Sequence, residues 1–420
     1  EVGIMGDLQG PKIRVGKFEH GRAHLDTGAA FILGAALDNK APLSNAERAS
    51  LDYKELPRDV KPGDVLLLAD GLIQLNVVRV VGEQVHTTVV HGGELSNNKG
   101  INKLGGGLTA PALTAKDLVD IKTAVDIAVD YLAVSFPKNA ADMQTARTVL
   151  AASGGKARLI AKIERAEAIV PETLDQIIDV SDGIMVARGD LAVEVGNAAV
   201  PALQKRMITR AREKNKLVIT ATQMMESMIT APVPTRAEVS DVANAVLDGT
   251  DAVMLSAESA AGKYPVETVK AMAAVALAAE RSQVYELDRD FINQQFVRVD
   301  QAIAMAALFT AFHLNAKAIA ALSQSGSTAL WMSRHDSGVP IYALTPEVGA
   351  ARRAALYRGV RPVLLPFEAD RDRALQGAED ALKARGAVAD GDLVVLSCGE
   401  PMGKSGGTNA LKVVKVGEHR

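Results

Sequence analysis

Charged side chains occur where a buried strand is expected. Residues 158–164 read RLIAKIE, and because side chains alternate along a strand, Lys162 and Glu164 share one face, about 6–7 Å apart. A lysine and a carboxylate in a buried strand are costly unless they serve each other or a ligand. This segment alone is compatible with a structural ion pair or a catalytic pair.

A second carboxylate follows the next apolar run. Residues 182–190 read DGIMVARGD, which places Asp190 at a strand end, and Gly189 permits close backbone approach. Two carboxylates from neighbouring strands suit Mg or Mn and leave positions for water and substrate. If a helix begins near Asp190, its amides can hold a substrate carboxylate. A plain N-cap role for Asp190 is the alternative.

Two further segments add hydroxyl and carboxyl groups. Thr222 lies in ATQM at 221–224, and Ser256 and Glu258 lie in MLSAE at 254–258. Thr222 is placed to bond substrate or to order a water molecule. Taken singly these residues are weak signals, since threonine is common in strands.

One structural unit recurs from about 117 to 280: a short apolar run, a polar turn and a helical pattern. The expected strands are 131–135, 158–163, 183–187, 217–222 and 252–255. The expected helices are 140–150, 166–180, 201–215 and 237–248. This spacing favours βα units and a parallel sheet, with reactive residues at the carboxyl ends of the strands, as in a (β/α) barrel. A doubly wound sheet has the same local pattern.

The other two regions differ from this unit. Residues 15–109 contain β-rich runs at 64–68, 72–78 and 84–90, which predict a small β-barrel domain inserted after a first strand at 2–5. Gly105–Gly107 and Pro111 would form its return hinge. After 282, strands at 318–322, 341–344, 363–365 and 393–396 predict a separate α/β domain.

The expected fold class is therefore α/β: a (β/α)8-type barrel over 1–14 and 110–282, a lid domain over 15–109 and a C-terminal α/β domain over 283–420. One barrel strand precedes the insertion and five follow. A closed barrel needs eight, so we expect the first two units to lie upstream of this sequence.

Composition excludes some classes of function. A formal charge of −3 argues against a nucleic-acid-binding surface, and 420 residues suffice for two or three domains. No apolar run is long enough to cross a bilayer, and residues 1–10 do not resemble a signal peptide. A single cysteine forms no internal disulfide, which fits a reducing, cytoplasmic setting.

The motifs together resemble one enzyme family. The ordered series DLQGPKIR at 7–14, AKIE at 161–164, MVARGDL at 185–191, ATQM at 221–224 and MLSAE at 254–258 is similar to pyruvate kinase. The domain order agrees along nearly the whole chain. The resemblance implies phosphoryl transfer from phosphoenolpyruvate to ADP, giving pyruvate and ATP in glycolysis.

The resemblance also implies roles for the site residues. Lys162 would meet the charge of the phosphoryl group, and Glu164 and Asp190 would bind Mg or Mn. Thr222 would stand beside the enolate carbon and act with water in its protonation. Gly189 and Asp190 would present amides to the substrate carboxylate.

The inserted domain carries the implied nucleotide contacts. Arg14 matches an arginine near the transferred phosphate, and Asp70 and Lys99 match positions that face ADP or ATP. An exposed loop lysine is an equally simple interpretation of Lys99. The domain is expected to close as a lid that excludes water.

The region of the monovalent cation, Asp7, Leu8 and Lys12, departs from the potassium-dependent members. They resemble one another in having Glu where this chain has Lys12 and Thr where it has Leu8. The ammonium of Lys12 could replace the potassium charge, so we expect activity without potassium. The alternative is a solvated lysine of no consequence.

The third region resembles the family's allosteric domain. Ser323, Ser325, Gly326, Ser327 and Thr328 lie at a strand-to-helix turn that could hold a phosphate, and Gly407 lies in a second small-residue loop, 404–408. The resemblance implies a sugar-phosphate effector and a homotetramer. Ordinary N-capping by serine is the alternative.

Two other functions fit part of the pattern. A metal-dependent aldolase or lyase acting on pyruvate enolate would also use Glu164 and Asp190, but it needs no nucleotide lid. A non-catalytic sugar-phosphate-binding paralogue is the other, and the joint presence of Lys162, Glu164, Asp190 and Thr222 argues against it. Nucleotide binding and turnover separate the three.

Overall fold

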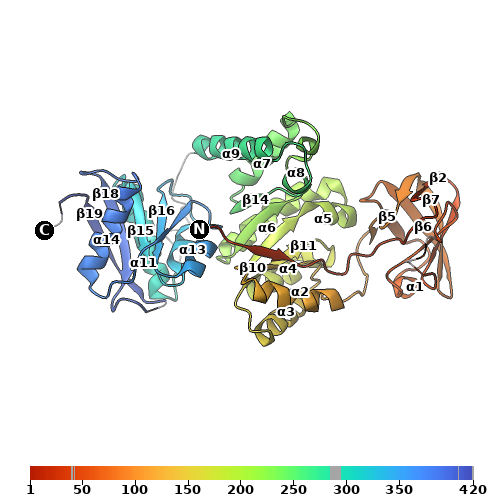
Figure 1. Cartoon of the computed structure of the whole chain (residues 1–420), viewed down its shortest axis with the longest axis horizontal. Helices are drawn as coiled ribbons and strands as arrows, with labels where there is room; N and C mark the ends of the chain where they lie inside the picture. Colours follow the sequence, from red (N-terminus) through yellow and green to blue (C-terminus); the bar gives the residue numbers. More distant parts are fainter. Residues whose placement is uncertain (39–40, 42, 284–294, 405, 419–420) are drawn as a thin grey trace.

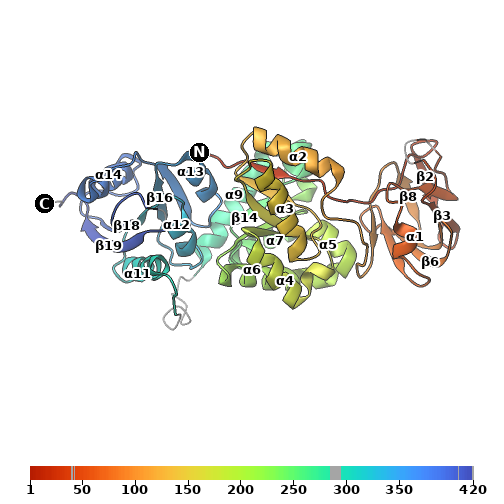
Figure 2. The same ribbon diagram turned by 90° about the horizontal axis from the view of Figure 1, so that it is seen from below.

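The computed structural model describes residues 1–38, 41, 43–283, 295–404 and 406–418. Figures 1 and 2 show three bodies in a row: an α/β body with the C-terminus, a central body around one parallel sheet, and a β unit at the far end. No helix in these residues has the length and apolar character needed to span a membrane.

The central sheet has six parallel strands in the order β1-β10-β11-β12-β13-β14. They are β1 (Met5–Asp7), β10 (Tyr131–Val134), β11 (Arg158–Ile163), β12 (Gly183–Ala187), β13 (Leu217–Ala221) and β14 (Ala252–Met254). Because these strands are all parallel, their carboxyl ends lie along one edge of the sheet. Helices lie over the face of this sheet that is seen in Figure 2, and the parallel strand order confirms the predicted α/β architecture.

The helices expected at 140–150, 201–215 and 237–248 are confirmed within two residues of those bounds, and further helices accompany them. Together they are α2 (Ala115–Asp126), α3 (Ala140–Ala152), α4 (Pro171–Val180), α5 (Arg188–Val195), α6 (Val200–Glu213), α7 (Arg236–Leu247), α8 (Ala257–Ala260) and α9 (Pro265–Ser282). Capping boxes begin α2 at Thr114 and α7 at Thr235. Proline in the first turn begins α4, α6 and α9.

Two predicted elements of the central body are wrong in their bounds. The first strand lies at Met5–Asp7 rather than 2–5, because only Met5 and its successors pair in register with β10. The helix expected over 166–180 is a 3₁₀ turn, η1 (Glu167–Ile169), followed by α4. Pro171 forces Val170 into an extended conformation, so the helix cannot run through it.

The β unit has one core and two sheets. The larger sheet has the order β4-β3-β7-β6-β5-β9, and β2 pairs with β8. The strands are β2 (Arg22–Leu25), β3 (Ala30–Gly34), β4 (Arg48–Ser50), β5 (Val65–Leu68), β6 (Ile73–Val81), β7 (Gln84–His91), β8 (Gly93–Ser96) and β9 (Ile101–Lys103), with a short helix α1 (Leu56–Asp59). The three longest predicted runs are confirmed as β5, β6 and β7. The sequence did not predict the remaining strands of this unit, which have three to five residues and show no clear period-2 pattern.

The C-terminal body has a five-stranded sheet in the order β17-β16-β15-β18-β19. Its elements are β15 (Ala318–Leu322), β16 (Ile341–Thr345), β17 (Val360–Leu364), β18 (Leu393–Gly399), β19 (Thr408–Lys415), α11 (Val299–His313), α12 (Ser327–Met332), α13 (Val348–Ala354) and α14 (Arg371–Ala384). Sequence reasoning missed β19, an antiparallel edge strand rich in polar residues.

A buried charge network joins the C-terminal body to the central sheet. Asp251, just before β14, pairs with Arg334 after α12, and both side chains are buried. The Asp251 carboxylate also accepts the backbone N–H groups of Val218 and Arg358. The Arg358 guanidinium donates to the carbonyls of Val246 and Thr250. Because burial makes an unpaired charge costly, these contacts fix how the two bodies pack.

Candidate functional site

Lys162 lies at the centre of a polar cluster built from three neighbouring strands. Its Nζ is 3.2 Å from Asp7 Oδ1 at the end of β1 and 3.0 Å from Ser135 Oγ just after β10. Glu164 Oε1, two residues further along the Lys162 strand, is also 3.2 Å away. The shared face predicted for Lys162 and Glu164 is therefore confirmed, and the two side chains are in contact.

Glu164 is almost fully buried, with 2% of its surface exposed. Burial, together with the nearby charge of Asp190, raises its pKa to about 7 although the charge of Lys162 opposes the shift. Its Oε2 accepts the N–H of Phe136 at 2.9 Å. Burial lowers the pKa of Lys162, but the carboxylates of Glu164 and Asp7 outweigh burial and raise it overall, so the lysine stays charged.

Asp190 lies in the first turn of α5, directly after β12. The helix begins at Arg188 with Ala187 as its N-cap, so the alternative of Asp190 as a plain N-cap is wrong. Instead Asp190 Oδ1 accepts Lys12 Nζ at 2.9 Å. Two residues of the predicted cation region therefore contact other predicted site residues: Asp7 contacts Lys162, and Lys12 contacts Asp190.

Thr222 follows β13 in an unusual backbone conformation. The strand ends at Ala221, and Thr222 has a φ of 69°, in the left-handed region. Its Oγ1 accepts the N–H of Gly189 at 2.8 Å and donates to the carbonyl of Ala221 at 2.6 Å. Of the two amides predicted to bind the substrate carboxylate, that of Gly189 is therefore engaged with Thr222.

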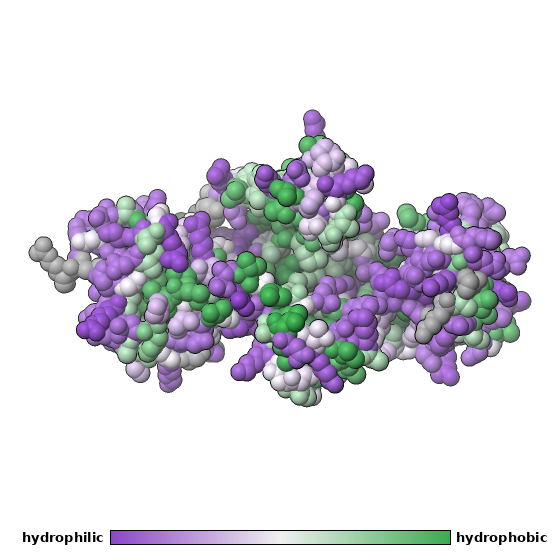
Figure 3. Space-filling view, viewed as in Figure 1, coloured by the Kyte–Doolittle hydropathy of each residue, from purple (hydrophilic) through white to green (hydrophobic). Residues whose placement is uncertain are grey.

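A cleft of about 640 Å³ lies between the β unit and the central sheet. Its walls include Asp70 on one side and Gly189, Asp190 and Thr222 on the other, with Lys12 between them. In Figure 3 the β unit, at the right, has a mainly hydrophilic surface, whereas hydrophobic residues gather on the central body. The structure thus brings five predicted site residues to one cavity.

Three predicted residues are not brought into these clusters. Arg14 Nη1 donates to the carbonyl of Asn98, at the junction with the β unit. Lys99 has an exposed side chain, which agrees with the simpler interpretation of it. Leu8 is buried in the hydrophobic core of the central body, on the face opposite Asp7.

The arrangement fits a divalent ion, although it is incomplete as a protein cage. Glu164 and Asp190 both provide carboxylate oxygens, and they are close enough for the charge of Asp190 to raise the pKa of Glu164. Lys12 uses one oxygen of Asp190, which leaves the second for a metal. In the part of the chain that the structure describes, no cluster of three or more potential metal ligands occurs. Substrate and water would have to supply the remaining positions.

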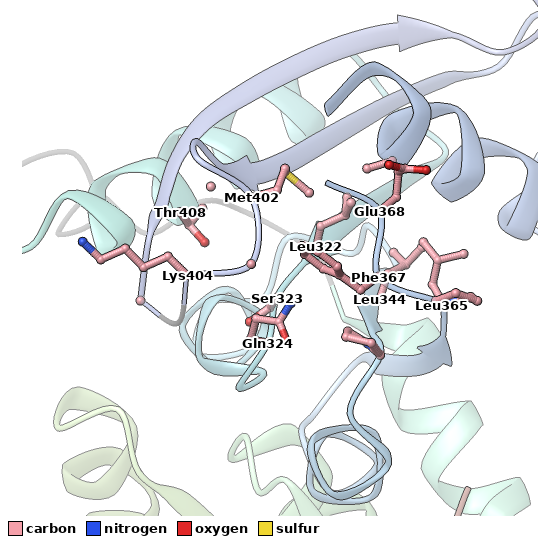
Figure 4. A pocket seen from close by; sticks show the side chains of 16 residues that line it. Leu322, Ser323, Gln324, Leu344, Leu365, Phe367, Glu368, Met402, Lys404 and Thr408 are labelled. Carbon is pink, nitrogen blue, oxygen red and sulfur yellow. The ribbon is translucent and has the colours of Figure 1, made fainter. Parts of the chain in front are cut away.

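The predicted effector loop forms part of a small cavity of about 50 Å³ in the C-terminal body. Ser323, Gln324 and Thr408 lie on one side of it, and Phe367 with other apolar side chains lies on the other (Figure 4). Figure 4 also shows Lys404 pointing away from the apolar side chains.

The hydroxyls of this loop are used locally. Ser323 Oγ accepts the N–H of Gly326 at 3.0 Å, Ser325 Oγ is 3.0 Å from Ser327 Oγ, and Thr328 Oγ1 is 2.8 Å from Thr408 Oγ1. Gly407 does not line the cavity, whereas its neighbour Gly406 does. Ser405 of the second loop lies outside the described residues.

Sequence reasoning missed two polar residues of the site. Ser135 contacts Lys162 and donates to the carbonyl of Leu8 at 2.7 Å. The rule that identified Asp190 and Thr222, a polar residue at the carboxyl end of a parallel strand, would also have identified Ser135. Arg188 was missed because its partner Asp241 is 53 residues away in the sequence, and local patterns do not show which distant side chain an arginine will contact.

Glu194, one helical turn beyond Asp190 on α5, provides a test of the electrostatics. Its side chain is buried and its Oε2 accepts the N–H of Ala166 at 2.8 Å. Burial raises its pKa to about 7, although the Ala166 N–H and Arg165 oppose the shift. The folded protein therefore holds a proton that the unfolded chain loses near its ordinary pKa of about 4.3. The stability that this group contributes is lost as pH rises through about 7.

We predict that Glu194→Gln, which keeps an acceptor for Ala166, flattens the pH dependence of stability. The free energy of unfolding, measured by urea titration, should be higher for the variant than for the parent at about pH 8, by up to about 1.4 kcal/mol per unit of pKa shift, and not at about pH 5. Glu213→Gln, at an exposed position, serves as the control. Parallel curves for Glu194→Gln and the parent would contradict the assignment.

Comparisons with known proteins agree with the geometry. The family model "Pyruvate kinase, barrel domain" matches residues 1–269, and "Pyruvate kinase, alpha/beta domain" matches residues 301–414. Pyruvate kinase II of Salmonella typhimurium is 52% identical over 99% of this chain and 86% of its own length. A pyruvate kinase of Buchnera aphidicola is 50% identical over 99% of this chain and 87% of its own, and one of Sporosarcina psychrophila is 39% identical over 99% and 71%. The chain belongs to the pyruvate kinase family, phosphotransferases that act on phosphoenolpyruvate and ADP and generally need a divalent metal ion.

Proposed function

We propose that the cleft between the β unit and the central sheet is where the phosphoryl group of phosphoenolpyruvate passes to ADP. One observation carries this proposal: three consecutive parallel strands bring the site residues to one edge of the sheet. Lys162 and Glu164 lie at the end of β11, Asp190 follows β12 by three residues, and Thr222 directly follows β13. Phosphoryl transfer chiefly requires positioning and charge neutralisation, and this edge of the sheet supplies a cation beside two carboxylates.

Lys162 is proposed to stabilise the phosphoryl group during transfer. Contacts with Asp7, Ser135 and Glu164 hold its ammonium in place before substrate arrives, so little reorganisation is needed at the moment of reaction. Glu164 and Asp190 would hold Mg or Mn, which when bound supplies positive charge to the phosphate and enolate oxygens.

Thr222 is proposed to deliver the proton that completes the reaction. Loss of the phosphoryl group leaves an enolate, and the electron pair of its C2=C3 bond takes a proton to form the C3–H bond of pyruvate while C2–O becomes a carbonyl. The Thr222 hydroxyl lies at the cleft wall and can pass this proton from water, regaining it from solvent. The amides of Gly189 and Asp190, in the first turn of α5, would hold the substrate carboxylate.

The β unit, residues 15–109, is proposed to be the nucleotide lid, with 1–14 and 110–282 as the barrel and 283–420 as the regulatory domain. Asp70 lines the cleft from the lid side. Arg14 and Lys99 lie near the same junction, and their contact with nucleotide would require the lid to move toward the sheet. Closure would exclude water from the phosphoryl group.

We predict that the chain makes ATP from phosphoenolpyruvate and ADP with Mg, and that Lys162→Ala reduces this rate at least about a hundredfold because the charge facing the phosphoryl group is lost. Lys383→Ala, which removes an exposed lysine paired with Asp390, should retain the parent's rate. ATP formation by a folded Lys162→Ala variant at the parent's rate would refute the role of Lys162. Nucleotide binding without turnover in the parent would instead favour a non-catalytic paralogue.

Activity without potassium is the second proposal on this site. Lys12 Nζ is bound to Asp190 and lies in the cleft, where a fixed ammonium can take the place of a monovalent cation. We predict that potassium chloride raises the rate no more than matched sodium chloride does. Lys12→Gln should lower the potassium-free rate about tenfold or more, since the cleft loses one positive charge. A many-fold rise of the parent's activity with potassium would contradict the proposal.

The C-terminal body is proposed to bind a sugar phosphate at the loop of Ser323, Ser325, Gly326, Ser327 and Thr328. The cavity beside this loop and the backbone amides at the start of α12 support the proposal, while the local hydroxyl contacts favour plain capping. We predict that a sugar monophosphate binds with a Kd below about 1 mM, near −4 kcal/mol, in calorimetry, and that Ser327→Asp abolishes the binding by charge repulsion. Absence of binding for a panel of sugar phosphates would leave capping as the role.

Two further properties rest on the family alone. We propose a homotetramer and a cytoplasmic location, as the resemblance implies. A sedimentation-equilibrium mass equal to one chain at assay concentration would contradict the first.

A further inference from the structure

The residue proposed to deliver the proton has a backbone that needs support. Thr222 has a φ of 69° and Gln223 a φ of 54°, so two consecutive residues other than glycine are left-handed. This conformation costs roughly 1–2 kcal/mol per residue and is worst for a β-branched side chain such as threonine. The surrounding structure must therefore hold Thr222 in this conformation.

The change in conformation also removes the Thr222 carbonyl from the sheet. The β13–β14 ladder runs only to the pair Ala221 and Met254. Beyond it the carbonyl of Thr222 has no strand partner, and a buried carbonyl without a donor is costly.

Arg188 supplies that donor. Its side chain is 9% exposed, and its Nη2 and Nε lie 2.6 and 3.2 Å from the carbonyl oxygen of Thr222. The same guanidinium donates through Nη1 to both carboxylate oxygens of Asp241 on α7, at 2.7 and 2.6 Å. Asp241 thereby fixes the plane of the guanidinium, which is rigid and forked.

Thr222 is thus held from two directions by consecutive residues. The side chain of Arg188 binds its carbonyl, and the backbone N–H of Gly189 binds its hydroxyl at 2.8 Å. Arg188 contacts none of the groups that surround Lys162. Its effect should therefore fall on the placement of the Thr222 hydroxyl and not on the cation that faces the phosphoryl group.

We propose that Arg188, oriented by Asp241, is a positioning residue for the proton-transfer step, which keeps the Thr222 hydroxyl aimed at the enolate carbon. The inference rests on the proposed role of Thr222. It separates the two halves of the reaction: loosening Thr222 slows protonation of the enolate on the enzyme, while phosphoryl transfer at Lys162 continues because the product can leave as the enol and become pyruvate in water.

The test measures the two halves in the same preparations. Exchange of the methyl hydrogens of pyruvate with deuterium, followed by NMR in D₂O with Mg and ATP, reports the proton step. ATP formation from phosphoenolpyruvate and ADP reports phosphoryl transfer. We expect Arg188→Gln to slow the exchange about tenfold to a hundredfold, with a much smaller loss in ATP formation.

Two more variants guard against a simple loss of folding. Asp241→Asn leaves Arg188 in place but loosens its orientation. It should therefore lower the ratio of the exchange rate to the rate of ATP formation, as Arg188→Gln does, but by less. Arg210→Gln removes another forked arginine–aspartate pair, with Asp175 on α4, that lies outside the cleft, and should leave the ratio unchanged. Equal losses in both halves for Arg188→Gln and Asp241→Asn would show a purely structural role and overturn the inference.

Thr222→Ala distinguishes a failure of the positioning role of Arg188 from a failure of the proposed role of Thr222 in proton transfer. If this variant exchanges pyruvate hydrogens as fast as the parent, the role of Thr222 is wrong and the inference falls with it. If Thr222→Ala loses exchange while both Arg188→Gln and Asp241→Asn retain the parent's ratio, only the positioning role of Arg188 is wrong.

Discussion

The ion pair between Lys162 and Glu164 is the constraint on which the site depends. Both side chains extend from the same face of a buried strand, and the carboxylate of Glu164 is almost completely buried. Desolvation of two charges exceeds what one contact returns, so further partners are required. Asp7, Ser135 and the N–H of Phe136 provide them, and they come from the two strands that precede β11 in the sheet. The order of the strands is therefore what makes a charged pair tolerable in this core.

The first turn of α5 concentrates three roles in three consecutive residues. Arg188 binds the carbonyl of Thr222, Gly189 binds its hydroxyl and Asp190 binds Lys12. A helix that starts directly after a parallel strand presents these groups at the carboxyl edge of the sheet, where the cleft lies. A small displacement of this turn would change the position of the proposed proton donor, Thr222, and of the proposed metal ligand, Asp190, at the same time.

The opposite edge of the sheet is where the C-terminal body is attached. Asp251 binds Arg334 and the backbone of Val218, the second residue of β13. The carboxyl end of β13 is the site of Thr222, while α12, which ends just before Arg334, begins at the proposed effector loop. The charges at this connection are paired, so it fixes the packing of the C-terminal body against the amino ends of β13 and β14.

Sequence by itself determined the parallel strands, the shared face of Lys162 and Glu164, and the polar residues at strand ends, because these follow from alternation and from spacing along the chain. It placed the start of α4 wrongly where Pro171 overrode the helical pattern, and it missed β19, whose polar residues carry no hydrophobic period. Only the tertiary structure decided that Lys12 binds Asp190 and that Arg188 binds Thr222 and Asp241. These contacts join residues 34 to 178 positions apart, and local propensity contains no information about which distant side chain will meet a given charge.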